Sequence, residues 1–180
     1  MHADVVVADS SIAGRGLVAT SGIPAGSVVS RLGGRLVCDA ELGRLFAAAA
    51  RSSSAYVDTI SVDDDLHLVL PPGRVNGCGN HSCDPNLWWV DAFTLAARRD
   101  IEVAEELTND YATSAAVDGF AMPCACGSAL CRGTVRGTDW QRPELQARYG
   151  DHYGDHWIPL LQRRIAAAAT GRRSTASGCS

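Results

Sequence analysis

The chain contains no lysine, because all 16 of its basic residues are arginine. Together with the many alanines this is typical of a GC-rich genome, and it also fits a protein that avoids modification of its own lysines. The net charge is −4, whereas a nucleic-acid-binding surface is basic, so we expect no direct nucleic-acid partner. No apolar run reaches the roughly 20 residues of a membrane span, so we expect no membrane partner.

The N-terminus also lacks a targeting pattern. Met1-His2-Ala3-Asp4-Val5 has no basic stretch followed by an apolar one, so we expect no secretory signal peptide. With 180 residues, 46% of them hydrophobic and 20% charged, the composition is that of an ordinary globular protein. This length suffices for one domain with a sizeable core and is short for two.

Seven cysteines are many for such a chain, and they fit either a secreted disulfide framework or an intracellular metal site. Three cluster as Cys-x-Cys-x4-Cys, and a fourth closes an earlier Asn-His-Ser-Cys run: Cys83, Cys124, Cys126 and Cys131. Four thiols are a full ligand set for tetrahedral zinc, although two pairs of buried free thiols would fit the same pattern. In a chain without a leader the clustering predicts a metal site and a cytoplasmic location.

Short β-branched runs separated by glycine and proline turns predict a mainly β chain with few helices. We expect strands over 4–8, 14–19, 27–32, 56–62, 66–70 and 87–97. Asp39 is a plausible N-cap for a helix with Leu42, Leu45 and Phe46 at helical spacing. From Pro143 onward the pattern is helical, and the Ser/Gly/Arg-rich tail from Thr170 is expected to be disordered.

Four segments together resemble SET-domain protein lysine methyltransferases of the compact bacterial type. They are Gly14-Arg15-Gly16-Leu17, Asn80-His81-Ser82-Cys83-Asp84-Pro85-Asn86, Glu105-Glu106-Leu107-Thr108-Asn109-Asp110-Tyr111 and Cys124 to Gly133. The resemblance covers about residues 5 to 135, and its last segment is similar to a post-SET zinc segment. It implies a SET domain over 1–119, a post-SET zinc segment over 120–137 and a C-terminal helical extension over 138–169, followed by the tail at 170–180.

The fold that this resemblance implies is a β-clip-like arrangement of small curved sheets with a pseudoknot. In it the Tyr111 segment passes beneath a loop and Cys83 meets the three later cysteines. Zinc at such a site has all four positions filled by thiolate, so its role is structural and it does not activate water. The ion is expected to hold the C-terminal segment over the active site.

The activity that the resemblance implies is transfer of a methyl group from S-adenosylmethionine to the ε-amine of lysine in a protein substrate. Tyr111 matches the catalytic tyrosine and also contacts the cofactor. The other residues implied at the cofactor are Gly14, Arg15, Gly16, Asn80 and His81, and Tyr56 is a candidate wall of the lysine channel. A catalytically silent SET module that binds a basic protein segment and a small-amine methyltransferase are the alternatives. Taken singly, Tyr111 could also be a buried structural tyrosine, and His81 could simply pack in the core.

Two departures from the family pattern stand out. Gly77-Cys78-Gly79 replaces the usual Arg followed by bulky residues, which bears on how firmly the cofactor loop is packed. Ala104 replaces a frequent Gly before Glu105. Neither change removes a residue with an implied catalytic role.

Overall fold

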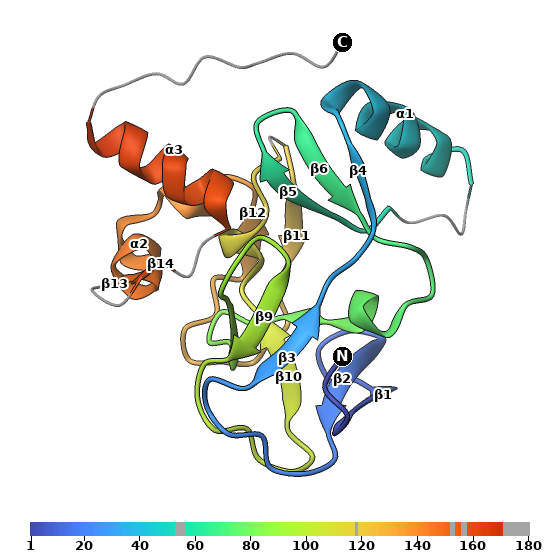
Figure 1. Cartoon of the computed structure of the whole chain (residues 1–180), viewed down its shortest axis with the longest axis vertical. Helices are drawn as coiled ribbons and strands as arrows, with labels where there is room; N and C mark the ends of the chain where they lie inside the picture. The colour runs from blue at the N-terminus through green and yellow to red at the C-terminus, as the bar shows by residue number, and fades with distance from the viewer. Residues whose placement is uncertain (53–56, 118, 152–153, 156–157, 171–180) are drawn as a thin grey trace.

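The computed structural model describes residues 1–52, 57–117, 119–151, 154–155 and 158–170. It consists of small sheets and three short helices, with no closed barrel among the described residues (Figure 1). The helices are α1 (Asp39–Ala49), α2 (Pro143–Tyr149) and α3 (Pro159–Ala169). Within this part of the chain no helix is long and apolar enough to cross a lipid bilayer. The mainly β architecture with short helices is therefore confirmed.

Three sheets of three or four strands form the body of the molecule. The first has the order β1 (Val5–Asp9), β2 (Arg15–Ala19), β10 (Glu106–Asn109) and β7 (Asn80–His81). The second has the order β3 (Val28–Arg31), β9 (Thr94–Ala97) and β8 (Leu87–Trp89), and the third β4 (Arg35–Val37), β6 (Leu66–Val69) and β5 (Thr59–Asp63). Two hairpins, β11 (Ala121–Pro123) with β12 (Thr134–Arg136) and β13 (Gly150–Asp151) with β14 (Gly154–Asp155), complete them.

Within the described residues, three single-turn 3-10 helices lie in the connections between the longer elements. They are η1 (Val75–Cys78), η2 (Tyr111–Thr113) and η3 (Asp139–Gln141). At the start of η2 the side chain of Asp110 accepts a hydrogen bond from the Ala112 N–H at 3.0 Å. A capping carboxylate fixes the direction in which the chain leaves β10, and it thereby fixes the position of Tyr111.

Three of the predicted elements differ from the structure. The strand expected over 87–97 is a hairpin of β8 and β9, because Asp91 accepts the Phe93 N–H at 2.7 Å and turns the chain. Asp39 is the first residue of α1 and not its N-cap, which is Cys38; its carboxylate lies 2.5 Å from His67 Nε2 instead. The helical pattern after residue 143 forms two helices, since α2 ends at Tyr149 before Gly150.

The C-terminal helices are part of the core. Tyr149, Ile158, Leu160 and Leu161 are at most 1% exposed and belong to the same apolar cluster as Leu107 of β10. In addition, the Ile158 N–H donates at 3.1 Å to the carbonyl of Thr113, the last residue of the turn that begins at Tyr111. Figure 1 shows α2 and α3 on one side of the sheets and α1 at the opposite end of the β4–β6–β5 sheet. The helical extension therefore packs against the core elements that carry the candidate site.

Candidate active site and thiol cluster

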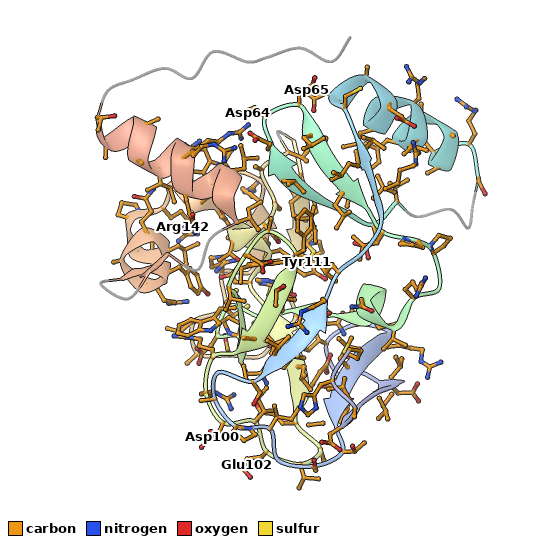
Figure 2. All side chains as sticks on the ribbon, viewed as in Figure 1. Asp64, Asp65, Asp100, Glu102, Tyr111 and Arg142 are labelled. Atoms are coloured by element: carbon orange, nitrogen blue, oxygen red, sulfur yellow. The ribbon has the colours of Figure 1, made fainter. Side chains whose placement is uncertain are left out.

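A parallel strand pair brings two of the four sequence motifs together. Thr108 of β10 lies opposite Asn80 of β7, and Asn109 lies opposite His81. The Ser82 N–H continues the ladder to the Asn109 carbonyl at 3.2 Å. Because Tyr111 comes two residues after the end of β10, this pairing places it beside the Asn-His segment. Figure 2 shows Tyr111 near the middle of the molecule, far from Asp64 and Asp65 at one edge.

The Asn80 side chain joins a third motif to this pair. Its amide nitrogen lies 3.1 Å from the carbonyls of Ala13 and Arg15, 3.0 Å from Ser10 Oγ and 2.8 Å from Glu106 Oε1. Ser10 Oγ also donates to the Glu106 carboxylate at 2.8 Å. The loop before β2 is therefore held against β7 and β10 by one amide and one carboxylate.

Both glycines of this loop are required by the geometry. Gly14 has φ +49°, a conformation that side chains with a Cβ rarely adopt. At Gly16 an added Cβ would lie 2.2 Å from Glu106 Oε1, which no side chain tolerates unless the carboxylate moves. The Arg15 side chain lies along β1, where Nη2 donates to the Val7 carbonyl at 3.2 Å. Only the backbone of Arg15 faces Asn80.

His81 is buried and neutral. Burial lowers its pKa to about 4, against the opposing effect of the nearby Asp110 carboxylate. Its Nδ1 accepts the Tyr111 N–H at 3.2 Å, so in the neutral ring the proton belongs on Nε2. Nε2 faces Cys83 Sγ at 3.3 Å. The imidazole thus links the tyrosine segment to the first cysteine of the cluster.

Tyr111 has a defined orientation at the wall of a cavity of about 440 Å³. Its hydroxyl donates to the Gly79 carbonyl at 2.7 Å, and its ring lies 5.3 Å from the His81 ring at 55°. Apolar side chains from β2, β8 and β9, among them Leu17 and Trp89, form much of the remaining wall. This volume falls in the range of pockets that hold small molecules.

The four predicted thiols converge. The Sγ atoms of Cys83, Cys124, Cys126 and Cys131 all lie within 4.8 Å of one another. Cys83 and Cys124 are 3.8 Å apart, and tetrahedral zinc with Zn–S bonds of about 2.3 Å places its sulfurs about 3.8 Å apart. Backbone N–H groups also point at two of the sulfurs, from Arg132 to Cys83 at 3.3 Å and from Gly133 to Cys131 at 3.5 Å. The arrangement fits a tetrahedral thiolate site.

The thiols differ in how readily they ionise. Burial raises the pKa of Cys83. Burial also opposes ionisation of Cys126, but hydrogen bonds from the Cys83 backbone and from Ser128 lower its pKa to about 6. A metal ion binds the thiolate form, so the cluster contains at least one thiol already prepared for a ligand role.

A model of the SET domain matches residues 14–112 of this chain. The chain belongs to the SET domain family. The matched part of this SET domain includes Gly16, Asn80, Cys83 and Tyr111, but it ends before Cys124. The assignment of 120–137 as a post-SET zinc segment therefore stays a prediction, and so do the other domain boundaries.

Similar proteins agree with this family. An H3 lysine-4 specific histone-lysine N-methyltransferase of Mycosarcoma maydis is 34% identical over 134 residues, which is 69% of this chain and 9% of that protein. Histone-lysine N-methyltransferase ash1 of Drosophila melanogaster is 42% identical over 75 residues, 38% of this chain and 3% of that protein. This SET domain protein therefore spans a small fraction of the length of these relatives.

The fold matches a solved SET domain. The crystal structure of the methyltransferase domain of human histone-lysine N-methyltransferase SETMAR aligns with a TM-score of 0.58 at 27% identity. The alignment covers 71% of this chain and 55% of that one. The SET-like fold expected from the sequence is thereby confirmed.

Two expectations concern residues that the structure does not describe. They are Tyr56, the candidate channel wall, and the tail from 171 to 180.

The sequence analysis missed a buried network beside the candidate site. In it Arg132 Nε lies 3.2 Å from Asp139, and the Tyr149 hydroxyl donates to Asp110 at 3.0 Å. One feature of the sequence could have indicated this network: Asp110 directly precedes Tyr111, and Arg132 directly follows Cys131.

Proposed function

We propose that this chain is an S-adenosylmethionine-dependent protein-lysine methyltransferase with Tyr111 as its catalytic residue. The observation that carries the proposal is the position of the Tyr111 hydroxyl. Tyr111 lines the 440 Å³ cavity, and its hydroxyl is fixed on the carbonyl of Gly79, the residue before Asn80, whose side chain holds the loop before β2. The histone-lysine N-methyltransferase relatives support the same reaction class.

The reaction needs a neutral amine held in line with the methyl donor. S-adenosylmethionine, when bound, supplies a methyl group already activated on a sulfonium. A free lysine has a pKa near 10.4, so its amine must lose a proton before it attacks. The apolar wall around Leu17, Leu95 and Trp89 disfavours the ammonium and so lowers that pKa.

Tyr111 can orient the amine without becoming ionised. Its hydroxyl proton is committed to the Gly79 carbonyl at 2.7 Å. A phenol oxygen that donates can also accept, so the Tyr111 hydroxyl could take an N–H of the substrate amine and direct the nitrogen lone pair toward the methyl donor. Fixed geometry of this kind supplies roughly 7–11 kcal/mol of a bimolecular barrier.

The cofactor contacts are assigned to the backbone of Gly14, Arg15 and Gly16 and to Asn80, His81 and Tyr111. Two observations support this assignment. Glycine at positions 14 and 16 lets the loop backbone adopt φ +49° and pack directly against Glu106, which suits a loop whose backbone, not its side chains, contacts a ligand. The neutral His81 ring adds no positive charge next to a cationic cofactor.

We further propose that the thiol cluster binds zinc with a structural role. Cys83, Cys124, Cys126 and Cys131 would fill all four positions, which leaves none for water or substrate. The metal would fasten the 120–137 segment to β7, and Arg132 would carry this constraint to Asp110 beside Tyr111.

Transfer of a labelled methyl group tests the proposal. The protein is incubated with tritiated S-adenosylmethionine and either cell lysate or lysine-containing peptides, and label on lysine is measured. We expect Tyr111→Phe to lose at least about 100-fold in rate while it still binds the cofactor, because the amine loses its alignment.

The alternatives give different results in the same assay. A wild-type protein that binds the cofactor yet labels no more than Tyr111→Phe is a silent binding module. Label confined to low-molecular-weight amines indicates a small-amine methyltransferase.

A further inference from the structure

Asp58 contributes an acidic group to the cavity that Tyr111 lines. It precedes β5 and is partly buried, and burial raises its pKa. Within the part of the chain that the structure describes, its carboxylate has no hydrogen bond or ion pair. No described arginine acts on its pKa either, since burial is the sole cause of the shift. A partly buried acid without a counter-ion is unfavourable, and a cationic ligand offsets that cost.

The carboxylate and the Tyr111 hydroxyl lie against the same short piece of chain. A Cβ added to Gly77 would come within 3.1 Å of Asp58 Oδ2, so the carboxylate lies beside the backbone of η1. Two residues later, the Gly79 carbonyl accepts the Tyr111 hydroxyl. Two residues span at most about 7 Å of chain. The acid and the proposed catalytic group therefore share one wall of the cavity.

Gly77 leaves this acid accessible. Any side chain at position 77 would begin within 3.1 Å of Oδ2 and would press on the carboxylate. The unusual Gly77-Cys78-Gly79 sequence thus has a structural consequence: no side chain at position 77 crowds the Asp58 carboxylate at the cavity that both residues line.

We propose that Asp58 determines substrate specificity by binding an arginine side chain that neighbours the target lysine. The inference rests on the proposed function, because it names the class of protein segment that enters the cavity. A guanidinium pairs with a carboxylate through two parallel hydrogen bonds, which makes it the best match for an acid without a partner. A cavity of about 440 Å³ has room for the target side chain and part of a neighbour.

The target amine itself is a poor occupant of this position. It must be neutral to attack the methyl group, and a carboxylate next to it would stabilise the ammonium form. The target nitrogen therefore belongs at the Tyr111 hydroxyl and a second cation at Asp58.

A peptide panel tests this assignment. Each peptide has one central lysine in an Ala/Gly/Ser background, with Arg, Gln or Glu placed in turn at each of the four positions on either side. For the wild-type protein we expect Arg over Gln to raise kcat/KM at one position by about 10-fold or more, as for a charge-assisted hydrogen bond. In Asp58→Asn this ratio should fall to about 1, and in Asp58→Arg glutamate should be preferred at that position. Asp9→Asn, an exposed acid on β1, should keep the wild-type ratio.

Binding of the same fluorescent peptides separates this inference from the proposed function. If no peptide is methylated, the methyltransferase proposal fails, but an arginine preference in binding that Asp58→Asn abolishes still supports the role of Asp58. Should Asp58→Arg not fold, the comparison of Asp58→Asn with the wild type is sufficient. An arginine preference that is absent, or that persists in Asp58→Asn, overturns the inference.

Discussion

Arg132 donates to both carboxylate oxygens of Asp110, through Nη1 at 2.7 Å and Nη2 at 2.6 Å, and both side chains are almost completely buried. Asp110 precedes Tyr111 and Arg132 follows Cys131, so this bidentate pair joins the candidate catalytic turn to the thiol cluster. Tyr149 of α2 adds a further donor to the same carboxylate, which also accepts the Ala112 N–H. The SET segment, the cysteine segment and the helical extension thus meet at one buried charge.

Replacing Arg132 is therefore expected to destabilise the whole fold. Arg132→Met leaves Asp110 buried without its counter-ion, which typically costs about 3–5 kcal/mol. Arg136→Met, on an exposed side chain four residues later, should change stability by no more than about 0.5 kcal/mol. Urea unfolding measures both. A double variant with Asp110→Asn should lose less than the sum of the single changes, and simple additivity would show that the two residues are not coupled.

The sequence motifs picked out residues that the structure brings together, but not the residues that support them. Asn80, His81, Tyr111 and the thiols each belong to a short motif whose order along the chain is informative. The network around Asp110 was not found, because Arg132 and Tyr149 reach it only through tertiary approach. Likewise, periodicity alone could not place the end of α2 at Gly150 or the turn at Asp91.

Ala104 illustrates a departure from the family pattern that the structure explains. Its φ is +64°, in the left-handed region where a Cβ costs roughly 1–2 kcal/mol. Ala104→Gly should therefore raise the free energy of unfolding, by about 1 kcal/mol. The same substitution at Ala48, exposed in α1, should lower it by about 1 kcal/mol. Thermal unfolding distinguishes the two, and a loss of stability in Ala104→Gly would contradict the backbone argument.

Gly16 is expected to control cofactor binding through Glu106. In Gly16→Ala the new Cβ would displace the carboxylate that holds Ser10 and Asn80, and overpacking of this kind costs about 1–3 kcal/mol. Calorimetric titration with S-adenosylmethionine should show an affinity at least about 10-fold weaker than the wild type. Gly43→Ala, where a Cβ meets nothing within 4 Å, is the matched control. Equal affinities for S-adenosylmethionine in both variants would show that this loop does not contribute to cofactor binding.

Zinc is expected to copurify with the protein at about one ion per chain. Cys126→Ser removes one of four thiolate ligands, so metal content and the unfolding temperature should both fall. Cys78→Ser changes a thiol outside the cluster and should retain the metal. Elemental analysis together with thermal unfolding in the presence and absence of a chelator provides the measurement. Metal retained at the wild-type level in Cys126→Ser would argue against a four-cysteine site.

Asp58 should make the stability of the fold depend on pH in an unusual direction. Because burial raises its pKa, the folded state prefers the protonated acid. Its contribution is fully present below the unfolded pKa, near 3.9, and is lost as the pH rises through the higher folded value. Asn resembles the protonated form, so Asp58→Asn should be more stable than the wild type at pH 7, with no difference below about pH 4. Urea unfolding between pH 3 and pH 8 measures this, with Asp9→Asn as the exposed control. If Asp58→Asn gains stability and also loses the preference for arginine peptides, Asp58 is a residue retained for binding at the expense of stability. A stability difference between Asp58→Asn and the wild type that does not change with pH would contradict the burial argument.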